Sequence, residues 1–541
     1  MRPIRALSLA AILAAAIPAQ ELAAAEPALL GPDRADFVQT SAAGDHFRVL
    51  PDAVFVAGPG SGVVVSVDAA ARLQTVEGIG SALTESSAYV VAHLPPAGRA
   101  WVLDLCFGPS GADFTMSRTH IGACDFCVKG HYSYDDTPGD TALAHFTIAP
   151  DLTYFDDVPG PGYALLPFIR DAIARQPALK IVSSPWTAPA WMKDNAAWHQ
   201  PGVKGGRLLP EYYGAFGRYI AKYLEAYRAA GVPVWAVTPE NEPLGNNGQW
   251  ESMEFSAAEM RDYIKLGLGP ALRDAGLSGV RILNYDQNRD DNAMAFTQAV
   301  LGDPAAAQFV WGTALHWYST TNSARTEVID QVRAAFPGKP VLHTEGCIDA
   351  LNLPQNTRDG RFLGWKNDAW WWSDDAADWG FKWASPAEKP DHPIYAPVHR
   401  YARDMIDGFN HGFVGWIDWN VVLDKHGGPN HVGNLAAAPV MVDTDNGEVY
   451  LTPVYYALAH FSRYIRPGDS IVRVTTTAPG LGADGFRATA ALSQDGRTLA
   501  VVAFNRSDHA VTYALEIGQK HAQVEIPANA LQSLRIDLGR L

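Results

Sequence analysis

The sequence predicts an α/β fold, a (β/α)8 TIM barrel with an attached β-sandwich domain. Eight short apolar, β-rich segments mostly alternate with helical or longer connecting segments over about 340 residues, which is typical of this barrel. From residue 470 onward, short β-rich segments replace the helices and indicate a sandwich. Strand-like segments before the barrel are too few to fold alone. We therefore expect the N-terminal strands to join the C-terminal segment in one discontinuous sandwich.

The barrel strands are expected where short apolar runs are bounded by turns or helical patterns. The eight predicted strands are 75–82, 114–122, 179–186, 233–238, 280–286, 309–316, 340–344 and 412–419. Between the third and fourth, aromatic and aliphatic residues recur at helical spacing and predict a helix over 211–230. Further helices are predicted at 257–275, 292–301, 326–336 and 395–409.

The sandwich strands follow from the same reading of the two ends of the chain. They are predicted at 47–50, 63–67, 471–476, 486–492, 499–504, 511–517 and 533–538. The chain then divides into an N-terminal segment, a catalytic barrel with a Trp-rich insertion at 348–392, and a C-terminal sandwich. These parts span residues 26–74, 75–445 and 446–541.

The first 25 residues have the pattern of a cleaved signal peptide. Arg2 and Arg5 precede a mostly apolar run from residue 6 to 17, and three alanines end the segment at Ala25. We expect the mature protein to be secreted or periplasmic. No later run of 18 apolar residues is present in the sequence, so no integral membrane segment is predicted.

The composition and motifs exclude several classes of binding partner and cofactor. The chain has 58 acidic and 42 basic residues, a net charge of −16, which excludes general electrostatic binding to nucleic acid. The single C-x-x-C of Cys124 and Cys127 is interpreted as buried thiols or one disulfide rather than a zinc site. No dinucleotide or phosphate-loop fingerprint occurs in the sequence. No cofactor or metal is predicted, and the oligomeric state is left open.

Carboxylates end two of the predicted barrel strands. Glu240, Asn241 and Glu242 follow the fourth strand, and Glu345 follows the seventh. Side chains of an extended segment alternate, so only one of Glu240 and Glu242 faces the centre, and Glu242 is our choice. Glycoside hydrolysis needs one carboxyl group to protonate the leaving oxygen and another to attack or to activate water. Each glutamate alone could be a surface ion pair, but the pair predicts a glycosidase.

Motifs along the chain resemble glycoside hydrolase family 30, the glucosylceramidase family. The segment from Trp235 to Pro243 resembles the acid/base segment of that family. Other matching segments follow in order: GIGSALTE at 78–85, ACDF at 123–126, SPWT at 184–187, HWY at 316–318, TEGC at 344–347, GWIDWN at 415–420, GGPN at 427–430 with Asn434, and FNRS at 504–507. The resemblance runs from about residue 72 to the C-terminus.

The resemblance implies roles by position. Glu242 would be the acid/base, Glu345 the nucleophile, and Asn241 would bind the sugar 2-hydroxyl. Because the family retains anomeric configuration, the two carboxyl groups are expected ~5–5.5 Å apart. Tyr318 would lie near Glu345 and influence its charge. The remaining substrate-site residues expected are His316, Trp186, Asp125, Trp419, Asn434 and Glu85.

The chain also departs from the glucosylceramidase pattern. Glu85 stands in place of an Asp, and His431 and Gly433 replace Trp and Arg before Asn434, which changes the expected pocket rim. The insertion at 348–392 carries six tryptophans. It is interpreted either as a wall of aromatic subsites or lipid-facing lip, or as a small satellite core. His316 and His343 could be metal ligands, but hydrogen bonding in the interior is preferred.

The function predicted is a retaining β-glycosidase, an O-glycoside hydrolase that cleaves β-glucosidic bonds. Its substrate would be a carbohydrate or glycolipid: glucosylceramide, an aryl or alkyl glucoside, or a short oligosaccharide. One alternative is an endo-β-1,6-glucanase or xylan-cleaving enzyme on the same fold. Another is a carbohydrate-binding protein that has lost catalysis, which the presence of both glutamates disfavours.

Overall fold

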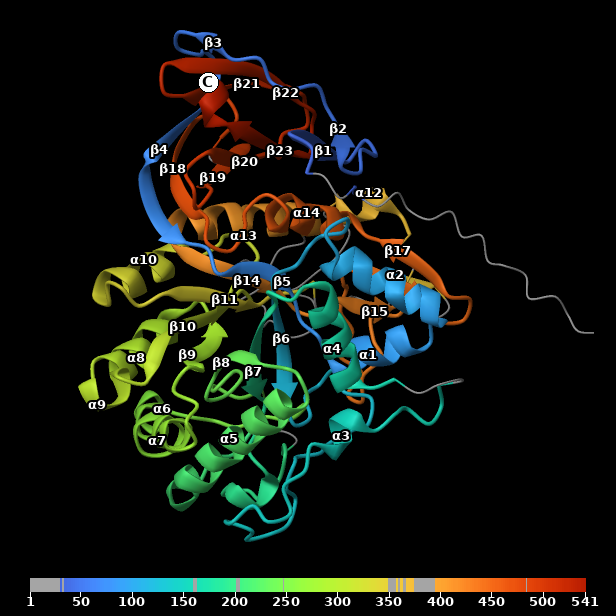
Figure 1. The fold of residues 1–541 in the computed structure, drawn as a ribbon, viewed down its shortest axis with the longest axis vertical. Coiled ribbons are helices and arrows are strands. Elements are labelled where there is room, and N and C mark those ends of the chain that lie inside the picture. Colours follow the sequence, from blue (N-terminus) through green and yellow to red (C-terminus); the bar gives the residue numbers. More distant parts are fainter. Residues whose placement is uncertain are drawn as a thin grey trace, which may run out of the picture.

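The structure is a computed structural model of the 541-residue chain. It describes residues 30–541 except 32–33, 159–162, 201–204, 247, 349–356, 359–360, 363–365, 374–394 and 483. The predicted signal peptide lies outside the described residues. Figure 1 shows a barrel surrounded by helices below and a β-sheet domain above it.

Eight parallel strands close the barrel, as predicted. Their spatial order is β10-β11-β14-β5-β6-β7-β8-β9, so the first and last strands in the chain are neighbours. The strands are β5 (Gly78–Ser81), β6 (Met116–Ile121), β7 (Lys180–Pro185), β8 (Val234–Val237), β9 (Arg281–Asn288), β10 (Val310–His316), β11 (Val341–Glu345) and β14 (Phe413–Asp418). All eight coincide with predicted segments to within about three residues. Their carboxyl ends open on the same side of the barrel.

Side chains fill the barrel rather than leaving a pore. One buried cluster takes at least one residue from seven of the strands, including Met116, Val182, Leu283 and Leu342. Gly80 on β5 is required by this packing, because a Cβ atom there would meet the carbonyl oxygen of Met116 at 1.9 Å. A packed interior leaves the strand ends as the place where a substrate can reach the barrel.

Helices surround the barrel between successive strands. They are α1 (Glu85–Ala92), α2 (Pro96–Phe107), α3 (Ala149–Leu152), α4 (Leu165–Arg175), α5 (Tyr213–Ala229), α6 (Ala257–Tyr263), α7 (Gly269–Asp274), α8 (Asp291–Leu301), α9 (Pro304–Ala307), α10 (Thr326–Ala335) and α13 (Pro397–His411). Those after residue 211 lie where they were predicted except α9, whereas α1 to α4 were not predicted. The single helix predicted at 257–275 is wrong in one respect. A π-helical turn, η3 (Ile264–Leu268), separates α6 from α7.

The N-terminal and C-terminal segments form one sheet domain, which confirms the discontinuous sandwich. Its ten strands lie in the order β2-β1-β23-β20-β19-β18-β4-β21-β22-β3. The N-terminal strands are β1 (Phe37–Ser41), β2 (Arg48–Val49), β3 (Val56–Ala57) and β4 (Val63–Thr75). The C-terminal strands are β18 (Ser470–Thr477), β19 (Phe486–Leu492), β20 (Thr498–Asn505), β21 (Val511–Ile517), β22 (Lys520–Ile526) and β23 (Ala530–Asp537).

Three of these strands were absent from the predictions. β3 has only two residues, β1 ends in the polar residues Gln39, Thr40 and Ser41, and β22 carries polar residues at alternate positions that weaken its apolar signal. β4 is longer than expected: it runs to Thr75, pairing antiparallel with β18 and parallel with β21. Residue 75 therefore ends a sheet strand instead of beginning the first barrel strand.

The barrel and the sheet domain are joined by packed helices. In Figure 1, α13 and α14 (Pro453–Ser462) lie between them. α14 contacts β5 of the barrel and β1 and β23 of the sheet domain. A small sheet of β15 (Val422–Asp424), β16 (Val440–Asp443) and β17 (Glu448–Leu451) precedes α14. Among the helices described, none is long and apolar enough to cross a membrane.

Only part of the predicted insertion at 348–392 can be placed. The described part holds strands β12 (Thr357–Arg358) and β13 (Arg361–Phe362) and helix α12 (Asp368–Trp371). Trp371 and Trp372 are buried, as in a satellite core. Trp365, Trp379 and Trp383 lie outside the described residues, so the role of the insertion stays a prediction. The four cysteines are buried free thiols.

Candidate active site

Glu242 and Glu345 meet at the carboxyl ends of the barrel strands. Glu345 is the last residue of β11, and Glu242 lies in the turn after β8. One carboxylate oxygen of each glutamate and a ring nitrogen of His316 lie within 4.8 Å of one another. This spacing fits the ~5–5.5 Å between the carboxyl groups of retaining glycosidases rather than the ~6.5–9.5 Å of inverting ones.

The backbone after β8 decides which glutamate faces the site. The Asn241 N–H donates to the Pro185 carbonyl at 2.7 Å, and the Glu242 N–H donates to the Asp286 carbonyl at 3.0 Å. Glu242 has a φ of 52°, a left-handed turn that a non-glycine residue adopts only when its surroundings impose it. Its side chain is one-fifth exposed and lies against His316.

Glu240 takes the opposite direction, into the protein. Its side chain is fully buried, and neither carboxylate oxygen has a hydrogen-bond partner. Burial raises the pKa of Glu240 well above its ordinary value, although the nearby Lys193 opposes the shift. The predicted division between Glu240 and Glu242 therefore agrees with the geometry, in which Glu242 is the exposed member.

A buried ion-pair network supports the two glutamates. Arg118, on β6, forms ion pairs with Glu345 and with Asp286, the latter at 2.7 Å. Asp286, on β9, also accepts hydrogen bonds from the hydroxyls of Ser184, Thr238 and Thr344. Burial opposes the charge on Asp286, but Arg118 and His316 outweigh it and lower the pKa of Asp286 below its ordinary value.

Arg118 and Asp286 were not among the predicted site residues. A signal was available, because Arg118 is a charged residue in the middle of a predicted barrel strand, and Asp286 ends another. A charge on a buried strand requires a partner in the folded state. The identity of that partner depends on the closure of the barrel, which places β6, β9 and β11 around one centre.

His316 bridges the network and the two glutamates. One of its ring nitrogens lies 3.0 Å from Asp286 Oδ1, and the other lies 3.2 Å from Glu242 Oε1. Burial lowers the pKa of His316, but the surrounding carboxylates outweigh burial and raise that pKa to about 9. Burial raises the pKa of Glu345, and His316 and Arg118 partly offset the effect. His316 is thus a cationic hydrogen-bonding residue of the site.

Two tryptophans and an amide line the site beside the glutamates. Trp186 and Trp419 stack with ring centroids 5.2 Å apart, and the Arg118 guanidinium lies 4.8 Å from the Trp186 ring. The amide oxygen of Asn241 accepts a hydrogen bond from Arg118 at 2.8 Å, which leaves its NH2 group to bind a hydroxyl. Indole faces and fixed polar groups are suited to binding a sugar ring.

Asp125 and Asn434 form another part of the wall. The Asn434 side-chain NH2 donates to Asp125 Oδ2 at 2.9 Å, joining the loop after β6 to the loop before β16. Burial raises the pKa of Asp125 to about 8, so the group is a hydrogen-bond donor as well as an acceptor near neutral pH. The structure therefore brings Asp125 and Asn434, both predicted as substrate-site residues, into direct contact.

Glu85 and Tyr318 lie differently from the other predicted residues. Glu85 begins α1 and is fully buried, and its carboxylate accepts hydrogen bonds from the N–H groups of Val128 and Lys129 at 2.8 and 2.9 Å. Glu85 therefore supports the loop after β6 from behind the pocket wall. Tyr318 is partly exposed; its ring centroid is 6.2 Å from that of His316, and its hydroxyl is 3.4 Å from Cys347 Sγ.

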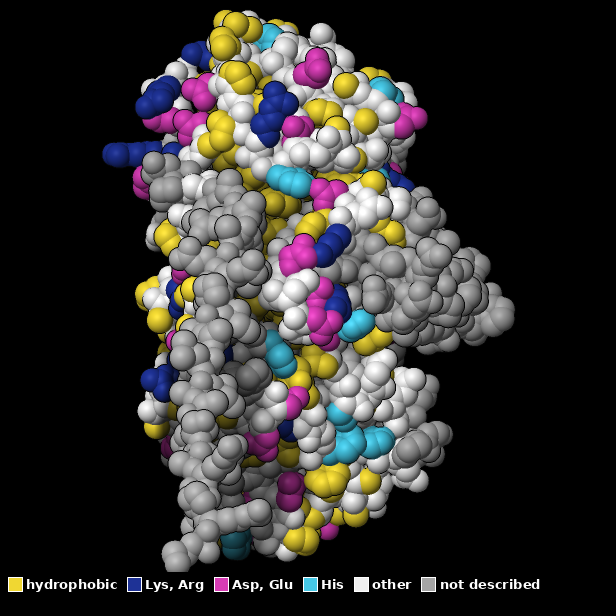
Figure 2. All heavy atoms as spheres, turned by 90° about the vertical axis from the view of Figure 1, so that its right-hand side faces the viewer, with side chains coloured by type: hydrophobic (Ala, Val, Ile, Leu, Met, Phe, Trp, Pro, Cys, Tyr) yellow, Lys and Arg dark blue, Asp and Glu magenta, His cyan; other side chains and the backbone are white. Residues whose placement is uncertain are grey.

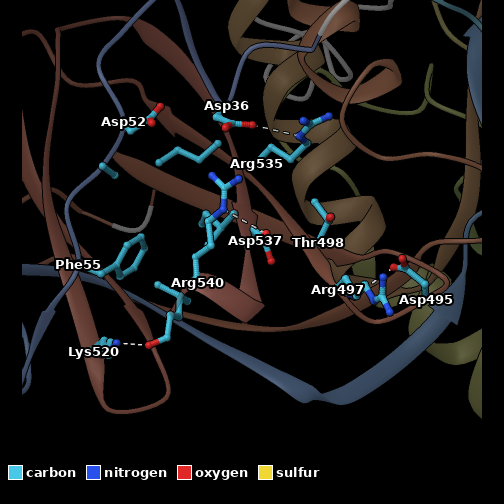
Figure 3. Close-up of a pocket in the computed structure, with 14 residues that line it drawn as sticks. Asp36, Asp52, Phe55, Asp495, Arg497, Thr498, Lys520, Arg535, Asp537 and Arg540 are labelled. Carbon is cyan, nitrogen blue, oxygen red and sulfur yellow. Dashed lines mark hydrogen bonds and ion pairs between the residues drawn. The ribbon is translucent and has the colours of Figure 1, made fainter.

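A hollow in the sheet domain is separate from this site. It has a volume of about 440 Å³ and is lined by strand and loop residues of the two chain ends. Figure 3 shows its charged side chains paired with one another: Asp36 with Arg535, and Asp537 with Arg540. The residues that line the hollow include neither Glu242 nor Glu345.

The fold and the paired glutamates define an O-glycoside hydrolase, and comparison with known proteins identifies the family. The family model "Glycosyl hydrolase family 30 TIM-barrel domain" matches residues 76–385 and 385–465, and the corresponding "beta sandwich domain" model matches residues 472–534. The chain belongs to glycoside hydrolase family 30, whose members act on carbohydrate substrates. The family expected from the sequence is therefore confirmed.

The proteins similar to this chain include both glucosylceramidases and endo-1,6-β-glucanases. The chain is 28% identical to the lysosomal acid glucosylceramidase of Mus musculus, over 84% of this chain and 79% of that protein. It is 29% identical to an endo-1,6-β-D-glucanase of Neurospora crassa, over 82% of each chain. The solved structure of SrfJ from Salmonella typhimurium superposes with a TM-score of 0.77 and 25% identity, covering 93% of this chain and 99% of that one.

Proposed function

We propose that this enzyme is a retaining β-glucosidase in which Glu345 is the nucleophile and Glu242 the acid/base. The observation that carries the proposal is the approach of the two glutamates and His316 within 4.8 Å at the mouth of the barrel. The asymmetry of the two carboxyl groups supports the assignment. Glu345 is ion-paired with Arg118, whereas Glu242 is the more exposed and free of that pairing.

The reaction takes place in two displacements. In the first, a Glu345 oxygen attacks the anomeric carbon while Glu242 donates its proton to the glycosidic oxygen, and the aglycone leaves as an alcohol. A glycosyl ester on Glu345 remains. In the second, Glu242, now a carboxylate, takes a proton from water, and that water displaces Glu345 from the anomeric carbon. Two inversions release the sugar with its original β configuration.

The surrounding residues assist each displacement. Arg118 and His316 place positive charge beside Glu345 and favour the carboxylate form that attacks. Asn241 would hold the sugar 2-hydroxyl, since its NH2 group is the part that Arg118 leaves unused. Trp186 and Trp419 would contact the apolar faces of the glycone, and Asp125 and Asn434 its hydroxyls. Tyr318 would contribute at the edge of the site.

The β-glucoside specificity is supported by the glucosylceramidase relative and by the aromatic and amide side chains around the glutamates. A glycolipid with a β-linked glucose is one member of this substrate class. An endo-β-1,6-glucanase is a second candidate, which the Neurospora relative favours. The two candidates share the same chemistry and differ in how much of the polymer the site accommodates.

A product time course distinguishes the two functions. The enzyme is incubated with an aryl β-glucoside, with soluble β-1,6-glucan and with glucosylceramide in detergent. Release of aryl alcohol and glucose from the aryl β-glucoside, without cleavage of the glucan, supports a β-glucosidase. The glucose should be in the β form when it is first released. A ladder of oligosaccharides from the glucan supports the endo-acting alternative. An α-configured first product contradicts the retaining mechanism.

Variants of the strand-end glutamates test the assigned roles. Glu345→Gln is expected to lower kcat at least about 10³-fold with folding intact, because the reaction loses its nucleophile. Glu242→Gln should slow alkyl glucosides far more than aryl glucosides, whose leaving groups need little protonation. Glu240→Gln is the matched control: it lies two residues away, is buried, and should keep near-normal activity. Similar losses in all three variants would contradict the assignment.

We also propose that the protein is exported after removal of residues 1–25. The support is the charge, apolar and small-residue pattern of that segment. Mass determination of protein recovered from the periplasm or medium should give an N-terminus at Glu26. Intact residues 1–25 in the mature protein would contradict this proposal.

A further inference from the structure

A second cluster of metal-ligating side chains lies beside the sugar site. Glu251 is at its centre, with His131 Nδ1 at 2.7 Å and His431 Nε2 at 3.3 Å from the same carboxylate oxygen. One ligand atom from each of the three residues lies within 4.8 Å of the others. The ring of His199 lies 4.6 Å from the ring of His131, centroid to centroid. Figure 2 shows histidine side chains gathered on one face of the molecule.

The cluster joins three loops at the carboxyl end of the barrel. His131 follows β6, Glu251 follows β8, and His431 follows β15. The backbone N–H of His431 donates to the Cys127 carbonyl at 3.0 Å. His431 is three residues before Asn434 in the chain, and Cys127 is two residues after Asp125. The cluster therefore forms part of the rim around the wall made by Asp125 and Asn434.

We propose that His131, Glu251 and His431 bind a divalent transition-metal ion of the zinc class. Imidazole nitrogens and a carboxylate oxygen are ligands that such ions prefer. The proposal concerns a site separate from the catalytic pair and does not depend on the substrate.

The orientation of His431 supports a ligand role. Its Nδ1 lies 2.9 Å from the Cys127 carbonyl oxygen, to which it can only donate. The other ring nitrogen, Nε2, lies 3.3 Å from a Glu251 carboxylate oxygen, so it is the nitrogen that faces the other proposed ligands. A backbone carbonyl that holds the other ring nitrogen is the usual support of a metal-bound histidine.

The state of Glu251 supplies a second, independent observation. The side chain is 1% exposed, and its Oε2 has no hydrogen-bond partner. A buried carboxylate oxygen without a partner is costly unless an ion or water reaches it. His131 is 29% exposed, so an ion can approach the cluster from solvent.

Two other groups of potential ligands occur among the described residues. His120, Cys124 and Cys127 are completely buried, so an ion has no direct approach to them. Glu242, His316 and Glu345 are the catalytic set, and Arg118 already supplies a positive charge there. Of these three groups, the rim cluster is the one with a histidine, His131, that is 29% exposed to solvent.

The test is calorimetric titration of the full-length enzyme with ZnCl2 after removal of metals with EDTA. We expect one site, with affinity lowered at least about 100-fold in His431→Ala and in Glu251→Gln. His145→Ala is the matched control, because His145 forms an exposed pair with Asp140 on the same loop region. A Cys124→Ser/Cys127→Ser variant and Glu345→Gln should each retain the site.

Two results would overturn the proposal. The first is no heat of zinc binding in the unmodified enzyme at concentrations up to about 1 mM, an affinity too weak for a structural ion. The second is binding that survives His431→Ala and His131→Gln but is lost with the cysteines or with Glu345. Far-UV circular dichroism of each variant confirms that it is folded. His131→Gln is included as a second variant in case His431→Ala misfolds, because His131 is partly exposed and its position should tolerate substitution.

Discussion

At the scale of single residues, Arg118 is the group on which the active site depends most. It is fully buried, yet it contacts Glu345, Asp286 and Asn241 at once. A buried charge is tolerated only with partners, and removing one member leaves the others unpaired. We therefore expect Arg118 both to stabilise the barrel mouth and to orient the Glu345 carboxylate.

Arg118→Met should lower the free energy of unfolding by about 3–5 kcal/mol, because Asp286 and Glu345 would keep their burial and lose their cation. Urea denaturation measures the change. Arg273→Ala is the control: Arg273 pairs with Asp274 on the surface, where an ion pair contributes about 0–1 kcal/mol. Equal losses of unfolding free energy in both variants would show that the buried network contributes no more to stability than a surface ion pair.

The charge state of Glu345 predicts the acid limb of the activity profile. Burial raises its pKa above the ordinary 4.5, and Glu345 must be ionised to act as the proposed nucleophile. Activity is therefore full above the raised pKa and is lost as the pH falls through it. The profile of kcat/KM on an aryl β-glucoside between pH 4 and 9 should show an acid limb above 4.5. A limb at or below pH 4 would contradict the shift.

At the scale of elements, the contact of α5 with η3 depends on two glycines. A Cβ atom on Gly217 would meet the Gly267 carbonyl oxygen at 2.5 Å, and one on Gly267 would meet the Tyr213 carbonyl oxygen at 2.3 Å. The atoms in the way belong to the backbone, so neither helix can yield by a side-chain rotation. The π-helical turn places Gly267 at this point of closest approach.

Gly267→Ala should lower the free energy of unfolding by about 1–3 kcal/mol, the usual cost of overpacking. The measurement is the urea midpoint at constant slope. Gly279→Ala serves as the control, since no atom lies within 4 Å of a Cβ placed there and its φ is not in the left-handed region. Gly267→Ala with stability equal to that of Gly279→Ala would mean that the two helices can move apart freely.

At the scale of the whole molecule, α14 holds the barrel and the sheet domain together through His460. One ring nitrogen lies 2.8 Å from the Ser533 hydroxyl on β23, and the other lies 2.9 Å from the Thr40 hydroxyl on β1. The ring is fully buried, and burial lowers the pKa of His460 to about 3. The interface therefore contains a histidine that stays neutral in the folded protein.

This histidine makes stability depend on pH. In the unfolded chain it binds a proton near its ordinary 6.5, whereas in the folded protein it does so near 3. Its contribution is fully present above pH 6.5 and is lost as the pH falls toward 3, by up to about 1.4 kcal/mol per pH unit. His460→Gln, which cannot titrate, should show a shallower loss between pH 6 and 4.

The comparison is made with urea denaturation at each pH. His509→Gln is the control, because His509 is exposed in the sheet domain. Its pH dependence should follow the unmodified enzyme. Parallel curves for His460→Gln and the unmodified enzyme would show that His460 does not govern the acid response of the interface.

The local pattern of the chain was enough for the eight barrel strands and for most strands of the sheet domain. Strands and helices follow from hydrophobic periodicity, which depends on neighbouring residues only. Glu242 and Glu345 were found because carboxylates directly follow apolar strands, and the carboxyl ends of barrel strands share one face. The polar residues of β1 and β22 and the two-residue length of β3 weakened the hydrophobic signal, so these strands were missed.

The tertiary structure decided what depends on contacts between distant residues. Arg118 contacts Asp286 and Glu345 only once the barrel has closed. Glu85 is held in the interior because its carboxylate accepts hydrogen bonds from the N–H groups of Val128 and Lys129. The π-helical turn within the helix predicted at 257–275 likewise lies where that helix packs closely against α5. The sequence by itself determined the barrel, the discontinuous sheet domain and the two glutamates, because these rest on local patterns. The ion-pair network and the histidine rim were decided by folding, because their members come from different strands and loops.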